Sequence, residues 1–135
     1  MSHGASFEPS ERGFTLSLRG GPEAASTARR ALGQLRGDFD DPLMETMRLL
    51  VTELVGNAVR HARATKVAVR AAVTDASIWL EVADEGPGFD RELAMRRGAQ
   101  SEQSGWGLFL VERLAHRWGV RREGDATHVW FELRR

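Results

Sequence analysis

The fold class is most clearly indicated by the segment Leu50-Val-Thr-Glu-Leu-Val-Gly-Asn-Ala-Val-Arg-His-Ala62. Apolar side chains recur at helical spacing here and upstream, which predicts one long helix over residues 41–62. Glu53 and Asn57 are four residues apart, so they lie about 40° from each other around the helix axis, beside the apolar stripe. A carboxylate next to an amide at the edge of a buried face can hold a hard cation and a water molecule. Two polar residues on a solvated border are the alternative that this stretch leaves open.

The segments on either side of this helix define the fold class. Asp41 is expected to be its N-cap and Pro42 its first helical residue. Strands are predicted where apolar and polar residues alternate, and further helices where the apolar period is longer. The expected strands cover residues 14–19, 67–73, 78–82, 119–122 and 127–133, and the expected further helices cover 22–36 and 107–116. Helices do not alternate singly with strands, so we expect an α+β fold: a two-layer sandwich of a mixed, mostly antiparallel sheet with helices on one face.

Two glycine-containing segments follow predicted regular elements. Asp84-Glu-Gly-Pro-Gly88 ends an apolar strand, where Asp84 can accept from an amino group and Gly86 and Gly88 allow close backbone approach to a ligand. Gly105-Trp-Gly-Leu108 opens a helix, and free N–H groups at a helix N-terminus suit a phosphate. Taken alone, each segment also fits an ordinary glycine turn.

Together and in this order, these motifs resemble the ATP-binding boxes of the GHKL superfamily, which includes gyrase, Hsp90, histidine kinases and MutL. The boxes are Glu-x-x-x-Asn at 53–57, Asp-x-Gly-x-Gly at 84–88 and Gly-x-Gly-Leu at 105–108. The short length, the layout and the tail at 117–132 resemble the bacterial anti-sigma-factor serine kinases. The resemblance implies a Bergerat-type ATP-binding domain over residues 13–135, preceded by a tail at 1–12.

The resemblance also implies roles for individual residues. Asn57 is implied to coordinate Mg²⁺, and Glu53 to act as the general base. Asp84 is implied to accept from the adenine amino group of ATP, with Thr127 assisting it. The implied nucleotide-binding set is Asn57, Asp84, Gly86, Gly88, Gly105, Trp106, Gly107, Leu108 and Thr127.

Four cationic residues near these boxes have two readings. Arg60 and His61 lie on or near the face of Glu53, where they either approach phosphate or form a solvated edge. Arg96 and Arg97 fall in residues 89–104, the segment that corresponds to an ATP lid, and either neutralise phosphate or are solvated.

Length and composition limit the possible functions. The chain has 135 residues, zero formal net charge and no cysteine. One domain is expected at this length. The lack of a basic excess argues against direct nucleic-acid binding, and the lack of cysteine excludes disulfides and thiolate chemistry. No stretch is apolar enough to span a membrane, and no export signal is recognised, so a cytoplasmic protein is expected.

The resemblance implies an ATP-binding anti-sigma factor that phosphorylates serine or threonine on a STAS-domain anti-anti-sigma protein and regulates transcription through a sigma factor. One alternative is an ATP-dependent partner-switching module without phosphotransfer, and another is a detached sensor-kinase catalytic domain. The strand at 14–19 is expected at a sheet edge, where pairing across a two-fold axis would protect it. The edge strand and the resemblance together predict a homodimer.

Overall fold

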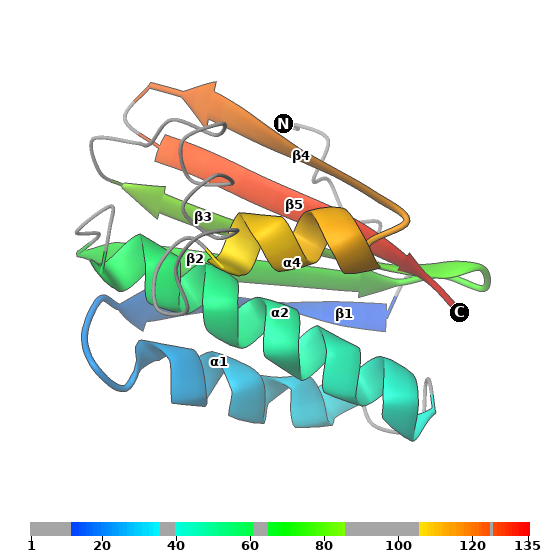
Figure 1. Cartoon of the computed structure of the whole chain (residues 1–135). Helices are drawn as coiled ribbons and strands as arrows, with labels where there is room; N and C mark the ends of the chain where they lie inside the picture. Colours follow the sequence, from blue (N-terminus) through cyan, green and yellow to red (C-terminus); the bar gives the residue numbers. More distant parts are fainter. Residues whose placement is uncertain (1–11, 36–39, 61–64, 86–105, 125) are drawn as a thin grey trace.

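Five strands form one antiparallel sheet in the computed structural model of the chain (Figure 1). The structure describes residues 12–35, 40–60, 65–85, 106–124 and 126–135. The spatial order of the strands is β1 (Arg12–Arg19), β2 (Lys66–Val73), β3 (Ser77–Glu85), β5 (Ala126–Arg134) and β4 (Arg117–Glu123). All four pairings are antiparallel, and β1 and β4 are the edges. The predicted antiparallel character and the edge position of the first strand are therefore confirmed.

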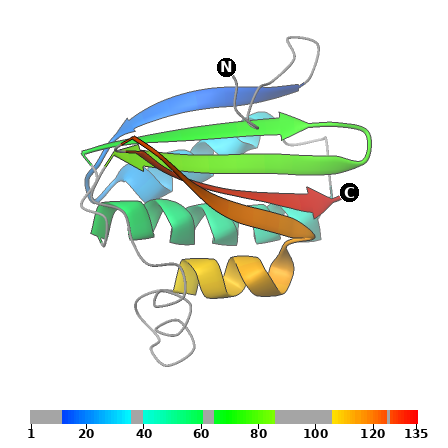
Figure 2. The same ribbon diagram turned by 90° about the horizontal axis from the view of Figure 1, so that it is seen from above.

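The helices of the described residues cover one face of this sheet (Figure 2). They are α1 (Ala24–Ala31), its 3₁₀ extension η1 (Leu32–Leu35), α2 (Asp41–Arg60) and α4 (Trp106–Leu114). The helix α2 packs against both α1 and α4, and it also contacts β2 and β3. This arrangement confirms the predicted two-layer sandwich with helices on one side.

The core lies between the two layers. In β3, Ile78, Leu80 and Val82 alternate with more polar residues and point at the helices, where each is at most 2 % exposed. On the helical side, Leu50 and Val51 of α2 are fully buried. Burying a large apolar side chain contributes roughly 1.5–3 kcal/mol, so this alternation fixes which face of each strand receives α2.

Several element boundaries differ from the sequence prediction, and three of the differences have a clear local description. The N-cap of α2 is Asp40 rather than Asp41, because Asp40 Oδ1 accepts from the backbone N–H of Leu43 at 2.9 Å. The helix predicted over 22–36 is a shorter α-helix that tightens into η1, since the N–H of Leu32 bonds to carbonyls of the preceding turn. Arg12, assigned to the tail by the sequence, is the first residue of β1.

The parts of the chain that carry the motifs meet at one end of the domain. The C-terminal half of α2, the end of β3, the start of β5 and the start of α4 all lie on the left in Figure 1. In the described part of the chain, no helix is long and apolar enough to cross a membrane.

Candidate functional site

A row of residues in register crosses the whole sheet on the helix-facing side at this end. It runs from β1 to β4 through Leu18, Val67, Asp84, Thr127 and Arg122. Leu18 and Val67 belong to the apolar core, whereas Asp84 and Thr127 are polar and only 4 % and 2 % exposed. The row therefore carries two buried polar side chains next to each other at the margin of the core.

Asp84 is the polar group of this row whose burial has the clearest cost in free energy. Its Oδ1 is buried and has no hydrogen-bond partner among the described residues. Burial raises the pKa of Asp84 to about 6, while the charges of Arg122 and His128 partly oppose that rise. A buried acceptor without a donor costs free energy, and a carboxyl with a perturbed pKa is a common mark of a functional site. At neutral pH the group is largely ionised and offers an unused acceptor.

Replacing Asp84 by asparagine is expected to stabilise the ligand-free protein at pH 7.5 by about 1–3 kcal/mol. The pKa of Asp84 is higher in the folded state (about 6) than its ordinary 3.8. Below pH 4 the Asp84 carboxyl is protonated in both the folded and the unfolded state, so Asp84→Asn gains little stability. Between pH 4 and 6 the wild type loses stability, and above pH 6 the loss is complete. Urea unfolding at pH 4 and pH 7.5 measures the difference.

Glu132→Gln is the control for this experiment, and it is expected to change the stability in the opposite direction. Hydrogen bonds from Ser77 and Arg117 hold the pKa of Glu132 below its usual range, so its removal is expected to lower stability at pH 7.5. A gain from Asp84→Asn that is the same at both pH values would contradict the assignment of a buried, energetically costly carboxylate.

Thr127 is held from the edge strand by a residue that the sequence analysis did not single out. Arg122 Nη1 donates to Thr127 Oγ1 at 2.6 Å. A signal for this contact was present, because a two-residue turn at Gly124-Asp125 places residue 122 opposite 127, and Gly124 has the positive φ of 61° that such a turn requires. The structure thus joins Asp84, Thr127 and Arg122 on three neighbouring strands.

The helix α2 contributes Glu53 and Asn57, both half-buried. Asn57 Oδ1 is buried and has no hydrogen-bond partner among the described residues, so it is available to a cation. No group of three His, Asp or Glu side chains in the described ranges could chelate a metal. Mg²⁺ keeps several waters and is commonly bound through one or two protein oxygens together with substrate phosphates. Asn57 would therefore hold Mg²⁺ only together with a phosphate ligand.

The third motif coincides with the start of α4. The helix begins at Trp106, one residue earlier than predicted, so the N–H groups of Gly107 and Leu108 belong to its first turn, which lacks intrahelical acceptors. The side chain of Leu108 is 1 % exposed and anchors this turn in the core. Packing of Leu108 thus fixes this helix start.

Several predicted residues lie outside the described residues. They are Gly86, Gly88, Arg96, Arg97, Gly105 and His61. Arg60 is described and folds back along α2, because a Cβ built on Gly56 would come within 2.8 Å of its Nη1. The Arg60 guanidinium therefore lies beside Gly56, the residue that precedes Asn57.

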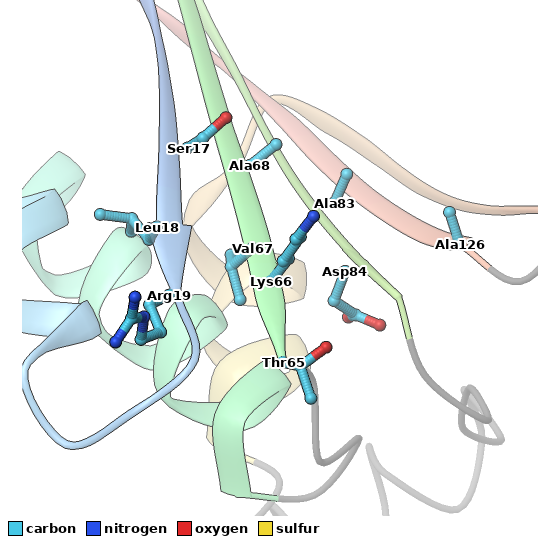
Figure 3. A pocket seen from close by; sticks show the side chains of 10 residues that line it. All are labelled: Ser17, Leu18, Arg19, Thr65, Lys66, Val67, Ala68, Ala83, Asp84 and Ala126. Carbon is cyan, nitrogen blue, oxygen red and sulfur yellow. The ribbon is translucent and has the colours of Figure 1, made fainter.

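A pocket of about 490 Å³ lies at the same end of the sheet, on the other face. Ser17, Ala68 and Ala83 line it, and they alternate along their strands with the residues that point at the helices (Figure 3). Asp84 borders it, and Lys66 adds a cation. The hollow therefore reaches the edge of the sheet at Asp84, whereas Asn57 does not line it.

This fold is that of a histidine kinase-like ATPase domain. The family profile described as the histidine kinase-like ATPase domain matches residues 18–133. The chain therefore belongs to the histidine kinase-like ATPase domain family, as the GHKL resemblance of its boxes predicts.

Individual relatives fall into two groups. The serine-protein kinases RsbW of Listeria monocytogenes and Listeria innocua are each 29 % identical over 116 residues, covering 75 % of this chain and 74 % of theirs. The sensor histidine kinase NarS of Mycobacterium tuberculosis is 38 % identical over 78 residues. That alignment covers 55 % of this chain, and this chain spans only 18 % of the sensor kinase.

A solved structure shows the same fold. The RsbU and RsbW domains of Rv1364c from Mycobacterium tuberculosis superpose with a TM-score of 0.69 and 23 % identity. The match covers 91 % of this chain and 32 % of that one. At this identity the likeness supports the architecture alone.

Proposed function

We propose that the chain is an ATP-binding anti-sigma factor with serine/threonine kinase activity toward a STAS-domain anti-anti-sigma protein. The observation that carries the proposal is the pair of orphaned buried acceptors, Asp84 Oδ1 and Asn57 Oδ1, on two elements that meet at one end of the domain. An amino group and a cation are the two partners that such oxygens lack, and Mg-ATP offers both. The similarity to RsbW serine-protein kinases over most of both chains supports the kinase activity.

The adenine end of the site consists of Asp84 and Thr127. The ionised Asp84 carboxylate accepts from the exocyclic amino group and thereby satisfies its buried oxygen. A base that presents a carbonyl at that position leaves two acceptors facing each other, which is the arrangement that gives strong discrimination. The side chain of Val67, the register partner of Asp84, adds a buried apolar wall at this end.

The phosphate end consists of α2 and the start of α4. The first-turn N–H groups of α4, including that of Leu108, face the anionic phosphates, and Asn57 would hold the Mg²⁺ that neutralises their charge. Glu53 takes the proton of the attacking serine hydroxyl. As the new bond from the serine oxygen to the γ-phosphorus forms, the bond from that phosphorus to the β–γ bridging oxygen breaks, and ADP leaves with the electron pair.

A detached sensor-kinase catalytic domain is the second candidate, because NarS has the higher identity over the aligned residues. The two candidates differ in the acceptor. The first phosphorylates a serine or threonine, which gives an acid-stable phosphate ester, and the second phosphorylates a histidine, which gives an acid-labile phosphoramidate.

The deciding experiment incubates the full chain with Mg²⁺, γ-labelled ATP and a STAS-domain protein. Acid-stable label on a STAS serine supports the proposal, and a Ser→Ala STAS variant serves as the control. ATP-dependent binding of the STAS protein without label transfer would instead identify a partner-switching module. Acid-labile label, found only when a histidine-containing dimerisation domain is supplied, would identify the sensor-kinase alternative.

We further propose that the chain is a homodimer at micromolar concentration. β1 is an edge strand, and its residues Thr15 and Ser17 are exposed. An unpaired edge is a ready template for another strand unless it is covered. Light scattering at roughly 10–50 µM protein, well above a micromolar dissociation constant, is expected to give twice the chain mass. A monomer mass throughout that range would contradict this.

A further inference from the structure

Arg122 is the positively charged member of the cross-sheet row on the helix-facing side. It occupies edge strand β4, and its register partner is Thr127, whose own partner on the other side is Asp84. Its neighbours on β4, Arg121 and Glu123, alternate with it and so belong to the other face, where Arg121 lies 3.8 Å from Glu81. Arg122 is therefore the arginine of this strand on the face that carries the candidate ligand site.

The contact from Arg122 determines how the Thr127 hydroxyl can be used. A guanidinium has only donors, so at 2.6 Å its Nη1–H occupies a lone pair of Oγ1. A hydroxyl that accepts there keeps its single proton for another acceptor. Thr127 is 2 % exposed, so that proton is directed within the site. The bond from Arg122 thus takes up one lone pair of the Thr127 hydroxyl and favours its use as a donor toward the ligand.

The same guanidinium acts on Asp84 through its charge. Of the groups around Asp84, Arg122 from β4 and His128 from β5 both favour the ionised carboxylate, and Arg122 has the larger effect. Lys66 of β2 lies at the rim that Asp84 borders, and α2 carries Glu53. Arg122 is a permanent cation among these groups, because arginine does not deprotonate in proteins.

We propose that Arg122 is a specificity-determining positioning residue: through Thr127 and Asp84 it sets a donor and an acceptor side by side in the polarity that adenine requires. Adenine presents an amino donor at position 6 and an acceptor at N1. Hypoxanthine presents a carbonyl acceptor and an N1–H donor, which reverses both. The inference rests on the proposed ATP binding and deepens it, since it assigns base selection to a residue that need not touch the base.

The test compares ATP and ITP, which differ only at these two positions. Calorimetry with Mg²⁺ is run from pH 6 to 8 on the wild type, Arg122→Gln, Arg122→Lys and the matched control Arg117→Gln. Arg117 lies on the same strand, on the other face, paired with Glu132 at 2.7 Å. Circular dichroism and urea unfolding verify that each variant is folded.

The wild type and Arg117→Gln are expected to prefer ATP over ITP by well over tenfold at pH 7.5, as for sites built on hydrogen-bond polarity. In Arg122→Gln the preference for ATP over ITP is expected to fall about tenfold. Without the positive charge of Arg122, Asp84 is expected to ionise at a higher pH, so the pH below which the preference disappears is expected to be about one unit higher than in the wild type. Arg122→Lys keeps the positive charge but loses the planar guanidinium group. It is therefore expected to keep the wild-type pH dependence of the ATP preference and to lose part of that preference.

Two results would overturn the inference while leaving the proposed function intact. One is an unchanged ATP-to-ITP ratio in Arg122→Gln. The other is an equal loss of affinity for both nucleotides at every pH, which a purely structural contact would give. Absence of ATP binding by the wild type would overturn both the inference and the proposed function.

Discussion

Asn57→Ala is expected to remove Mg²⁺-dependent ATP binding while leaving the fold at least as stable as the wild type. A cation held by one amide oxygen, phosphates and water loses its protein anchor when that amide is deleted. The affinity for Mg-ATP is expected to fall by roughly 100-fold or more, the scale of losing contacts to a charged group. The stability expectation follows from Asn57 Oδ1, which is buried and has no hydrogen-bond partner within the described ranges, so its removal relieves a buried unsatisfied acceptor.

Calorimetry with ATP in the presence and absence of Mg²⁺ measures the first effect, and urea unfolding measures the second. Thr46→Ala is the matched control, because Thr46 lies on the same helix and its hydroxyl bonds only to the carbonyl of Pro42 one turn earlier. Wild-type affinity in Asn57→Ala would remove Asn57 from the cation. A large loss of stability would mean that the amide is a structural group whose partner is part of the fold.

The sheet and the long helix could be predicted from the sequence because their apolar periods are unambiguous. Branched aliphatic residues recur at every second position in most of residues 67–73 and 78–82, and the structure places Val67, Ile78 and Leu80 among others on the helix-facing side. The N-cap was misplaced by one residue for a definite reason. Asp40 and Asp41 are both good caps, and local sequence does not say which of them leaves the helical conformation first.

The site was predicted less completely because part of it depends on pairing between strands. Asp84 and Thr127 are far apart in the sequence and were linked only through the family resemblance; the register of β3 with β5 brings them opposite each other. Arg122 carries no local motif, and its contact with Thr127 appears only when the hairpin register is known. The burial that perturbs the pKa of Asp84 is likewise a property of the packed layers.

Orphaned acceptors explain why stability and function oppose each other in this site. Asp84 and Asn57 each bury an oxygen that has no donor in the described part of the chain, which lowers the stability of the ligand-free protein. A ligand that supplies the missing partners recovers that free energy on binding and stabilises the folded state further by mass action. Mg-ATP is therefore expected to raise the unfolding temperature of the wild type more than that of Asp84→Asn, whose own gain in stability is already present without ligand.

Glu53→Gln is expected to separate binding from chemistry. Glutamine preserves the size and the helical position of the side chain but cannot take a proton, so the rate of transfer to the STAS-domain serine is expected to fall by about 10²–10⁴-fold. The affinity for Mg-ATP is expected to stay within about threefold of the wild type, because a base acts in the transition state and contributes little to ground-state binding.

Single-turnover transfer of label measures the rate, and calorimetry measures the affinity. Glu45→Gln is the matched control on the same helix, where Glu45 is exposed and contacts Arg48 at 3.4 Å; it is expected to change neither quantity. Equal losses of affinity and rate in Glu53→Gln would assign Glu53 to positioning the cation with Asn57, because an interaction present in both ground and transition states lowers binding and turnover alike. An unchanged rate would remove Glu53 from the reaction and leave the proton of the serine hydroxyl to the γ-phosphate itself.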